Sequence, residues 1–153
     1  MDTTVSRDIA ASPERVWATM TDVEGSPEVL SGVESVERLD GGGSFGVGTR
    51  WRETRTMFGK QATEEMAVTA VDPGRSYTVE ADSRGAHYVS VLRVEPLGQG
   101  RSRLSMTFSG TPSGLPGRVL AATVGRLFAP ATRKALQRDL DDIAAHAEAA
   151  PGG

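Results

Sequence analysis

The middle of the chain alternates between apolar and polar positions through five successive runs, each about as long as a β-strand. Because neighbouring side chains of a strand point to opposite faces of a sheet, this alternation predicts strands with one apolar face. The other face carries threonine, arginine and glutamate, which suits contact with water. The predicted apolar face consists of Trp51, Met57, Met66, Val68, Tyr77, Val79, Tyr88, Leu92, Met106 and Phe108.

Turn sequences containing glycine separate these runs at nearly regular intervals. The intervals are too short for helical crossovers, so the runs predict antiparallel neighbours in one sheet. The predicted turns are Phe58-Gly59-Lys60, Asp72-Pro73-Gly74, Ser83-Arg84-Gly85 and Leu97-Gly98-Gln99-Gly100.

Assumed lengths for these turns determine which residues face each other across the strands. A hairpin tip at Gly59-Lys60 predicts that Arg55 lies opposite Glu64, Glu53 opposite Met66 and Trp51 opposite Val68. The later turns predict the pairs Ala70–Tyr77, Val68–Val79, Met66–Ala81, Ala81–Tyr88, Val79–Ser90, Leu92–Met106 and Ser90–Phe108. Every step keeps the apolar set on one face, which is the condition for a consistent register.

Two further strands and two short helices are predicted before the meander. The strands run from Thr3 to Ala10 and from Val33 to Leu39. Between them, Ser12 suits the N-cap of a helix and Pro13 its first position. A second short helix or turn is predicted to begin at Pro27.

The apolar period changes to that of a helix between Leu115 and about Ala149. Pro130 interrupts the pattern, so a kink near Leu127 is expected. The stripe consists of Leu120, Val124, Leu127, Phe128, Ala131, Leu136, Leu140, Ile143 and Ala147. The charged residues of this helix are predicted to form a solvated surface: Arg118, Arg126, Arg133, Lys134 and Arg138, offset by Asp139, Asp141 and Asp142.

Composition narrows the class of protein. The 153 residues form the equivalent of one domain, predicted over residues 1–150 with a disordered tail at 151–153. A net charge of −3 gives no general attraction to nucleic acid. The absence of cysteine excludes disulfides, thiolate zinc sites and cysteine nucleophiles. No apolar run approaches the ~20 residues of a membrane span, and no signal peptide is recognisable, so a cytoplasmic location is expected.

A glycine-rich segment contains the spacing GxGxxG at Gly41, Gly43 and Gly46. A dinucleotide site needs a helix directly after this motif, but the sequence continues as a strand. The segment is therefore interpreted as a connection between strands, with a role at the rim of a pocket as the alternative.

Two histidines are present, so a histidine-rich metal centre is excluded. His146 falls near the end of the long helix, where its charge favours the helix dipole. His87 is predicted to lie opposite Asp82 on the outer face, as a surface pair. We expect no metal and no cofactor.

Arg55 and Glu64 are the charged residues that the predicted register pairs on the apolar face. Charges there are costly unless they are paired or hydrated. Either the hairpin tip reaches water, or the pair anchors the polar end of a ligand or transfers protons. Tyr77, Tyr88 and Ser90 add hydroxyl groups to the same face. The apolar wall itself allows two interpretations, a solid core or a ligand cavity, and the curvature expected of the sheet favours the cavity.

The order of elements resembles the polyketide cyclase/dehydrase-like families of the START-like, or SRPBCC, superfamily. The resemblance runs from about Val5 to Glu148. It is carried by Ser12-Pro13-Glu14-Arg15-Val16-Trp17 at the first helix, Gly48-Thr49-Arg50-Trp51 at a strand and Asp72-Pro73-Gly74 at a turn. The resemblance implies an α+β helix-grip fold, in which a curved antiparallel sheet of six or seven strands wraps around the long C-terminal helix and leaves a cavity between them.

The resemblance also implies binding or transport of a small hydrophobic ligand, which is lipid-, sterol- or polyketide-like. The alternative is a polyketide cyclase or aromatase, but the superfamily has no universal catalytic motif, so no catalytic residue is assigned. A third alternative, an interaction module, lacks a supporting apolar patch. We expect a monomer or homodimer that neither binds nucleic acid nor inserts stably into membranes. The predicted ligand-binding residues are Trp51, Arg55, Met57, Glu64, Met66, Val68, Tyr77, Val79, Tyr88, Ser90, Leu92, Met106, Phe108, Leu120, Val124 and Phe128.

Overall fold

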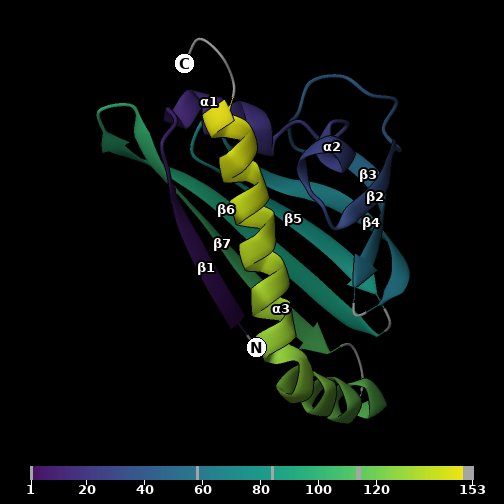
Figure 1. Cartoon of the computed structure of the whole chain (residues 1–153). Helices are drawn as coiled ribbons and strands as arrows, with labels where there is room; N and C mark the ends of the chain where they lie inside the picture. The colour runs from purple at the N-terminus through teal and green to yellow at the C-terminus, as the bar shows by residue number, and fades with distance from the viewer. Residues whose placement is uncertain (1, 58, 84, 113–114, 150–153) are drawn as a thin grey trace.

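The computed structural model describes residues 2–57, 59–83, 85–112 and 115–149, and all of their side chains except those at positions 57, 60, 83 and 112–130. Within these residues, seven strands form one antiparallel sheet in the order β1-β7-β6-β5-β4-β3-β2. The strands are β1 (Asp2–Ile9), β2 (Val33–Arg38), β3 (Arg50–Met57), β4 (Lys60–Asp72), β5 (Ser76–Ser83), β6 (Ala86–Gly98) and β7 (Arg101–Pro112). The sheet curves around one long helix (Figure 1), which confirms the predicted α+β helix-grip class.

The helices follow the predicted signals. Helix α1 (Pro13–Met20) begins with its proline in the first turn, and the Ser12 hydroxyl accepts a hydrogen bond from the Arg15 amide at 3.2 Å. Helix α2 (Ser26–Val29) is one turn long. Helix α3 (Leu115–Ala149) crosses the concave face, and its ribbon changes direction in its first part, consistent with Pro130 inside the helix (Figure 1). Among the described residues, no helix combines the length and apolar composition that crossing a bilayer requires.

The core lies where the second half of α3 meets the concave face. Leu140 of α3, Val16 of α1, Ile9 of β1 and Leu104 of β7 are completely buried in one cluster. The predicted helical stripe is confirmed in this half, since Leu136, Leu140, Ile143 and Ala147 are all buried. The strands alternate as expected: Val68, Tyr77, Val79 and Leu92 are buried, while their neighbours along each strand are more exposed.

Much of the predicted register is confirmed. The strands β5, β6 and β7 pair with no irregularity around the middle of the sheet. The confirmed pairs are Val68–Val79, Ala81–Tyr88, Val79–Ser90, Leu92–Met106 and Ser90–Phe108.

The predicted pairing of β3 with β4 is wrong by two residues. Met57 pairs with Lys60, so the turn lies one position earlier than predicted. Consequently Trp51 faces Met66, Glu53 faces Glu64 and Arg55 faces Ala62. A shift by an even number of residues keeps every side chain on its predicted face, so the predicted apolar face is unchanged.

The predicted pair Ala70–Tyr77 is also wrong, because a β-bulge lies between Val68 and Ala70. Tyr77 faces Val71 instead. Bulges increase the local bend and twist of a strand. This one, with two others in the sheet, adds to the curvature that lets the strands wrap around α3.

The remaining differences from the predicted elements are small. The first strand begins and ends one residue earlier than predicted, and β2 ends at Arg38 instead of Leu39. The glycine-rich segment joins β2 to β3 without a helix, so the dinucleotide interpretation is excluded. Gly41, Gly42 and Gly43 all have positive φ angles, a conformation that glycine adopts without a steric penalty.

Leu140→Ala tests whether the contact between α3 and the sheet holds the fold together. The substitution leaves a void at a completely buried position, so we expect the free energy of unfolding to fall by about 2–5 kcal/mol. Urea unfolding followed by circular dichroism measures it. Leu97→Ala, at a side chain that is 40% exposed, is the matched control and should change stability by less than about 0.5 kcal/mol. Equal effects of the two substitutions would contradict the assigned core.

Candidate functional site

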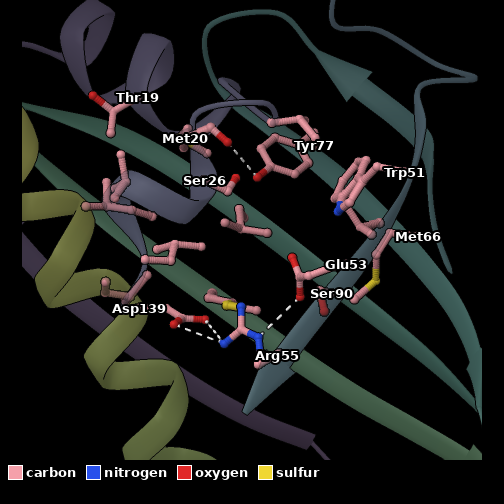
Figure 2. Close-up of a pocket in the computed structure, with 18 residues that line it drawn as sticks. Thr19, Met20, Ser26, Trp51, Glu53, Arg55, Met66, Tyr77, Ser90 and Asp139 are labelled. Atoms are coloured by element: carbon pink, nitrogen blue, oxygen red, sulfur yellow. Dashed lines mark hydrogen bonds and ion pairs between the residues drawn. The ribbon is translucent and has the colours of Figure 1, made fainter. Parts of the chain in front are cut away.

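A cavity of about 130 Å³ lies between the concave face of the sheet and the helices (Figure 2). Its sheet wall includes Trp51, Tyr77 and Leu92, and its helix wall includes Met20 of α1 and Ile143 of α3. The sheet face therefore forms both a packed core and a cavity, and the two alternatives left open by the sequence coexist.

Eight of the predicted ligand-binding residues line this cavity. They come from β3, β4, β5, β6 and β7, so five strands converge on one space. The eight are Trp51, Arg55, Met66, Tyr77, Val79, Ser90, Leu92 and Met106.

Four predicted residues lie elsewhere. Val68 is only 2% exposed and belongs to the solid core. Glu64 is half-buried opposite Glu53, outside the cavity lining, so the predicted pairing of Arg55 with Glu64 is corrected. Tyr88 and Phe108 stack on each other with ring centroids 5.4 Å apart, also outside the lining. The side chains of Met57, Leu120, Val124 and Phe128 lie outside the described residues.

The polar end of the cavity is an ion cluster centred on Arg55 (Figure 2). Its Nη1 donates to both carboxylate oxygens of Asp139, at 2.9 and 3.1 Å, and its Nε donates to Glu53 at 3.2 Å. The three side chains are between 9% and 15% exposed. Glu53 and Arg55 stand two apart on β3 and so share a face, while Asp139 reaches them from α3.

The cluster has one positive charge against two negative charges when all three groups are ionised. Burial raises the pKa of Asp139, and Glu53 and Asp142 act in the same direction, while Arg55 opposes them. Burial works against the charge of Arg55, but Asp139 and Glu53 outweigh it and raise its pKa. Asp139 therefore holds a proton to a higher pH than an ordinary aspartate does.

Sequence reasoning assigned Asp139 to the solvated surface of the long helix, and this was wrong. The exposed positions of Arg133, Lys134 and Arg138 confirm the rest of that assignment for the basic side chains that the structure describes. A signal was present, because Asp139 stands three positions after Leu136 and four before Ile143, inside the apolar stripe. A carboxylate in such a stripe requires a buried partner, and Arg55 is that partner.

Tyr77 is a fixed part of the wall. Its hydroxyl donates to the carbonyl oxygen of Met20 at 2.9 Å, which ties β5 to the end of α1. Burial raises the pKa of Tyr77 above its ordinary value, with Glu53 and Asp139 adding to the effect. Its ring also meets Trp17 and Phe45 edge-on, so part of the glycine-rich connection covers this end of the sheet.

His87 lies away from the cavity, as predicted. It pairs with Asp82 across the strands and contacts Asp82 and Glu80 at 2.7 Å each. Its hydrogen bonds to these carboxylates, Asp82 first, raise its pKa. Among the described side chains, no group of three or more histidine, aspartate or glutamate residues is arranged to hold a metal ion.

Comparison with known proteins identifies the family to which this chain belongs. A family model described as polyketide cyclase/dehydrase and lipid transport matches residues 1–148. The chain belongs to this family. The match confirms the resemblance drawn from the sequence, although the family description spans both an enzymatic and a transport activity. No curated protein matches the sequence closely.

Solved structures share the fold at low sequence identity. The protein TTHA0849 of Thermus thermophilus has a TM-score of 0.80 and 21% identity, covering 99% of this chain and 100% of its own. The Zhui aromatase/cyclase of Streptomyces sp. R1128 has a TM-score of 0.77 and 20% identity, covering 100% and 98%. Truncated norcoclaurine synthase of Thalictrum flavum has a TM-score of 0.75 and 17% identity, covering 98% and 94%.

Two substitutions test the charge balance of the cluster. Asp139→Asn leaves Glu53 and Arg55 as a neutral pair, whereas Arg55→Met leaves two buried carboxylates without a counterion. We expect Arg55→Met to lower the free energy of unfolding by about 3–5 kcal/mol at pH 7, and Asp139→Asn to lower it by less. Urea unfolding measures both losses of stability. A larger loss in Asp139→Asn than in Arg55→Met would contradict the assignment of one positive and two negative charges to the cluster.

The pH dependence of the same variants gives a second readout. Because the pKa of Asp139 is raised in the folded state, the folded protein holds this proton to a higher pH than the unfolded chain. The stability from the protonated group is present at low pH and is lost as the pH rises through the folded pKa. Asparagine does not titrate, so the stability of Asp139→Asn relative to the wild type should rise from about pH 4 upward.

Proposed function

We propose that this protein binds a small hydrophobic ligand in the cavity between the sheet and α3. The observation that carries the proposal is a largely apolar cavity with its charged groups, Glu53, Arg55 and Asp139, gathered at one end. Trp51, Val79, Leu92 and Ile143 provide apolar walls, and Arg55 with its partners provides the polar end. Ligand sites commonly combine mostly apolar walls with a few polar groups that orient the ligand.

The size of the cavity limits the part of a ligand that fits. A volume of about 130 Å³ is close to the ~150 Å³ apolar cavity that holds benzene in an engineered protein. It is smaller than the roughly 300–1,000 Å³ of drug-sized pockets. The cavity therefore suits one aromatic ring or a short alkyl chain, and a longer lipid-, sterol- or polyketide-like molecule has to extend beyond it.

The polar end favours a ligand that accepts a hydrogen bond. The Nε and Nη1 atoms of Arg55 are engaged by Glu53 and Asp139, while Nη2 forms no hydrogen bond with the described residues. A carbonyl or phenol oxygen of the ligand can accept from Nη2 without breaking the cluster. Tyr77 cannot donate to a ligand in this way, because its hydroxyl already donates a hydrogen bond to the carbonyl oxygen of Met20.

Ser90→Leu tests the cavity as the binding site. Ser90 lines the cavity on β6, so the larger side chain fills part of the volume. We expect the affinity for a ring-sized apolar probe to fall at least about tenfold. Displacement of an apolar dye, with native mass spectrometry of the gently purified protein, provides the measurement.

Ser105→Leu is the matched control for this test. Ser105 precedes Met106 on β7, so its side chain points to the opposite face of the sheet from the cavity. The affinity of the Ser105→Leu variant for the probe should equal that of the wild type. Failure of the wild-type protein to bind any aromatic, lipid or steroid probe would reject the proposed function.

A second candidate function is a cyclase or aromatase that acts on a polyketide-like substrate. The observation in its favour is that two carboxyl groups, Glu53 and Asp139, face the cavity, and that the pKa of Asp139 is raised. A raised pKa brings a carboxyl group nearer to the range where it donates and accepts protons at neutral pH. These two groups replace the pair Arg55 and Glu64, because Glu64 does not line the cavity.

Turnover of a poly-β-ketone analogue by the wild type and by Asp139→Asn separates the two functions. If the protein is an enzyme, we expect Asp139→Asn to lower kcat by about 10²-fold, with ligand affinity within about threefold of the wild type. Asp82→Asn, on the outer face, is the control and should leave kcat unchanged. Absence of turnover by the wild type, together with tight binding, would exclude the enzymatic candidate for this substrate class.

A further inference from the structure

A second pocket, of about 500 Å³, lies beside the cavity and is lined by residues at the end of β3 and by residues of α3. Its lining includes Arg55, Thr56, Lys134, Arg138 and Asp141. Arg55 lines both spaces, so one residue borders the smaller cavity and this larger pocket.

The second pocket has an excess of positive charge. Lys134 and Arg138 stand four positions apart on α3, so both project toward the same side of the helix. Both are exposed, and neither forms an ion pair with a residue that the structure describes. The carboxylate of Asp141 is already paired with Arg7 at 2.8 Å and accepts from Gln137 at 3.3 Å.

Two guanidinium groups converge at the boundary between the spaces. A Cβ atom on Gly32 would lie 3.1 Å from Nη2 of Arg138 and 3.6 Å from Nη1 of Arg55. Asp139 and Glu53 neutralise Arg55 on the cavity side. No described carboxylate does so for Arg138, so an anion beside it gains attraction without displacing an existing partner.

We propose that the second pocket binds the carboxylate or phosphate group of an amphipathic ligand whose ring lies in the cavity, with Lys134 and Arg138 as the recognition residues. This inference rests on the proposed ligand-binding function. It also explains how a ligand larger than the cavity of about 130 Å³ could bind, because the rest of the molecule extends past Arg55 into the larger pocket. The ligand class is then an aryl or short-chain acid or phosphate monoester, instead of a neutral sterol.

Isothermal titration with matched probes tests the proposal. The probes are ω-phenylalkanoates of increasing chain length, their neutral methyl esters and the corresponding phenylalkyl phosphates. At low ionic strength we expect the acid or the phosphate to bind about tenfold more tightly than the ester, with a maximum at one chain length. The preference should decrease as salt is added, because the recognition groups are exposed.

The variant Lys134→Gln/Arg138→Gln should lose this preference and keep the affinity for the neutral ester, which also shows that it is folded. Arg93→Gln/Arg101→Gln removes the same two charges at exposed positions on β6 and β7, and it should behave as the wild type. This control separates local recognition from a change in net charge.

Each other outcome has a distinct meaning. If the esters bind and the charged probes bind no more tightly than the esters, the second pocket is not an anion site and the proposed binding in the cavity stands. The same conclusion follows if the preference for charged probes persists in Lys134→Gln/Arg138→Gln. If inorganic phosphate alone binds as tightly as the phenylalkyl phosphates, the pocket takes a free anion, and the bridging ligand is rejected. If no probe binds, the proposed function fails and this inference fails with it.

Discussion

The structure depends on one requirement, that the apolar concave face of the sheet be removed from water. The second half of α3 covers one region of this face with its buried stripe at Leu136, Leu140 and Ile143. The cavity lies between the concave face and this half of α3, and residues of α1 and α2 line another side of it.

The ion cluster shows how a charged group is accommodated at such an interface. Burial of a carboxylate is costly, and the cost is offset only when a partner with good geometry is already in place. Arg55 provides that partner for Asp139 from the sheet and is itself oriented by Glu53 on the same strand. The cluster therefore links α3 to β3 through charged groups that would otherwise be hydrated, and it places these charges beside the cavity.

Several features could be read from the sequence because local rules determine them. The helix start at Ser12, the apolar face and the pairs around Val79 and Ser90 depend on capping, alternation and turn length. The errors arose where a single residue changes the geometry, as in the turn after Met57 and the bulge before Ala70. The shift of two positions at the turn leaves the apolar pattern unchanged, whereas the bulge shifts the pairing by one position and places Val71, instead of Ala70, opposite Tyr77.

The partner of Arg55 was missed for a different reason. Asp139 lies far from Arg55 along the chain, and only the tertiary fold brings them together. The size of the cavity was equally out of reach, since volume depends on the curvature of seven strands and the path of the helix. Eight of the residues predicted to bind a ligand nevertheless line the cavity, because the face to which they belong follows from the alternation along the strands.

The pairing of β1 with β7, which lie far apart along the chain, has a consequence for how the molecule is made. Strand β1 lies along β7, with Asp2 beside Ser109 and Ile9 beside Ser102. Strand β1 therefore waits for its neighbour until the strands β2 to β6 have been synthesised. A fold with such distant contacts closes slowly, and β1 has to stay free of other sheet edges during that interval. Six of its eight side chains are hydrophilic, and Val5 and Ile9 are its apolar residues, which limits association with other chains before β7 is available.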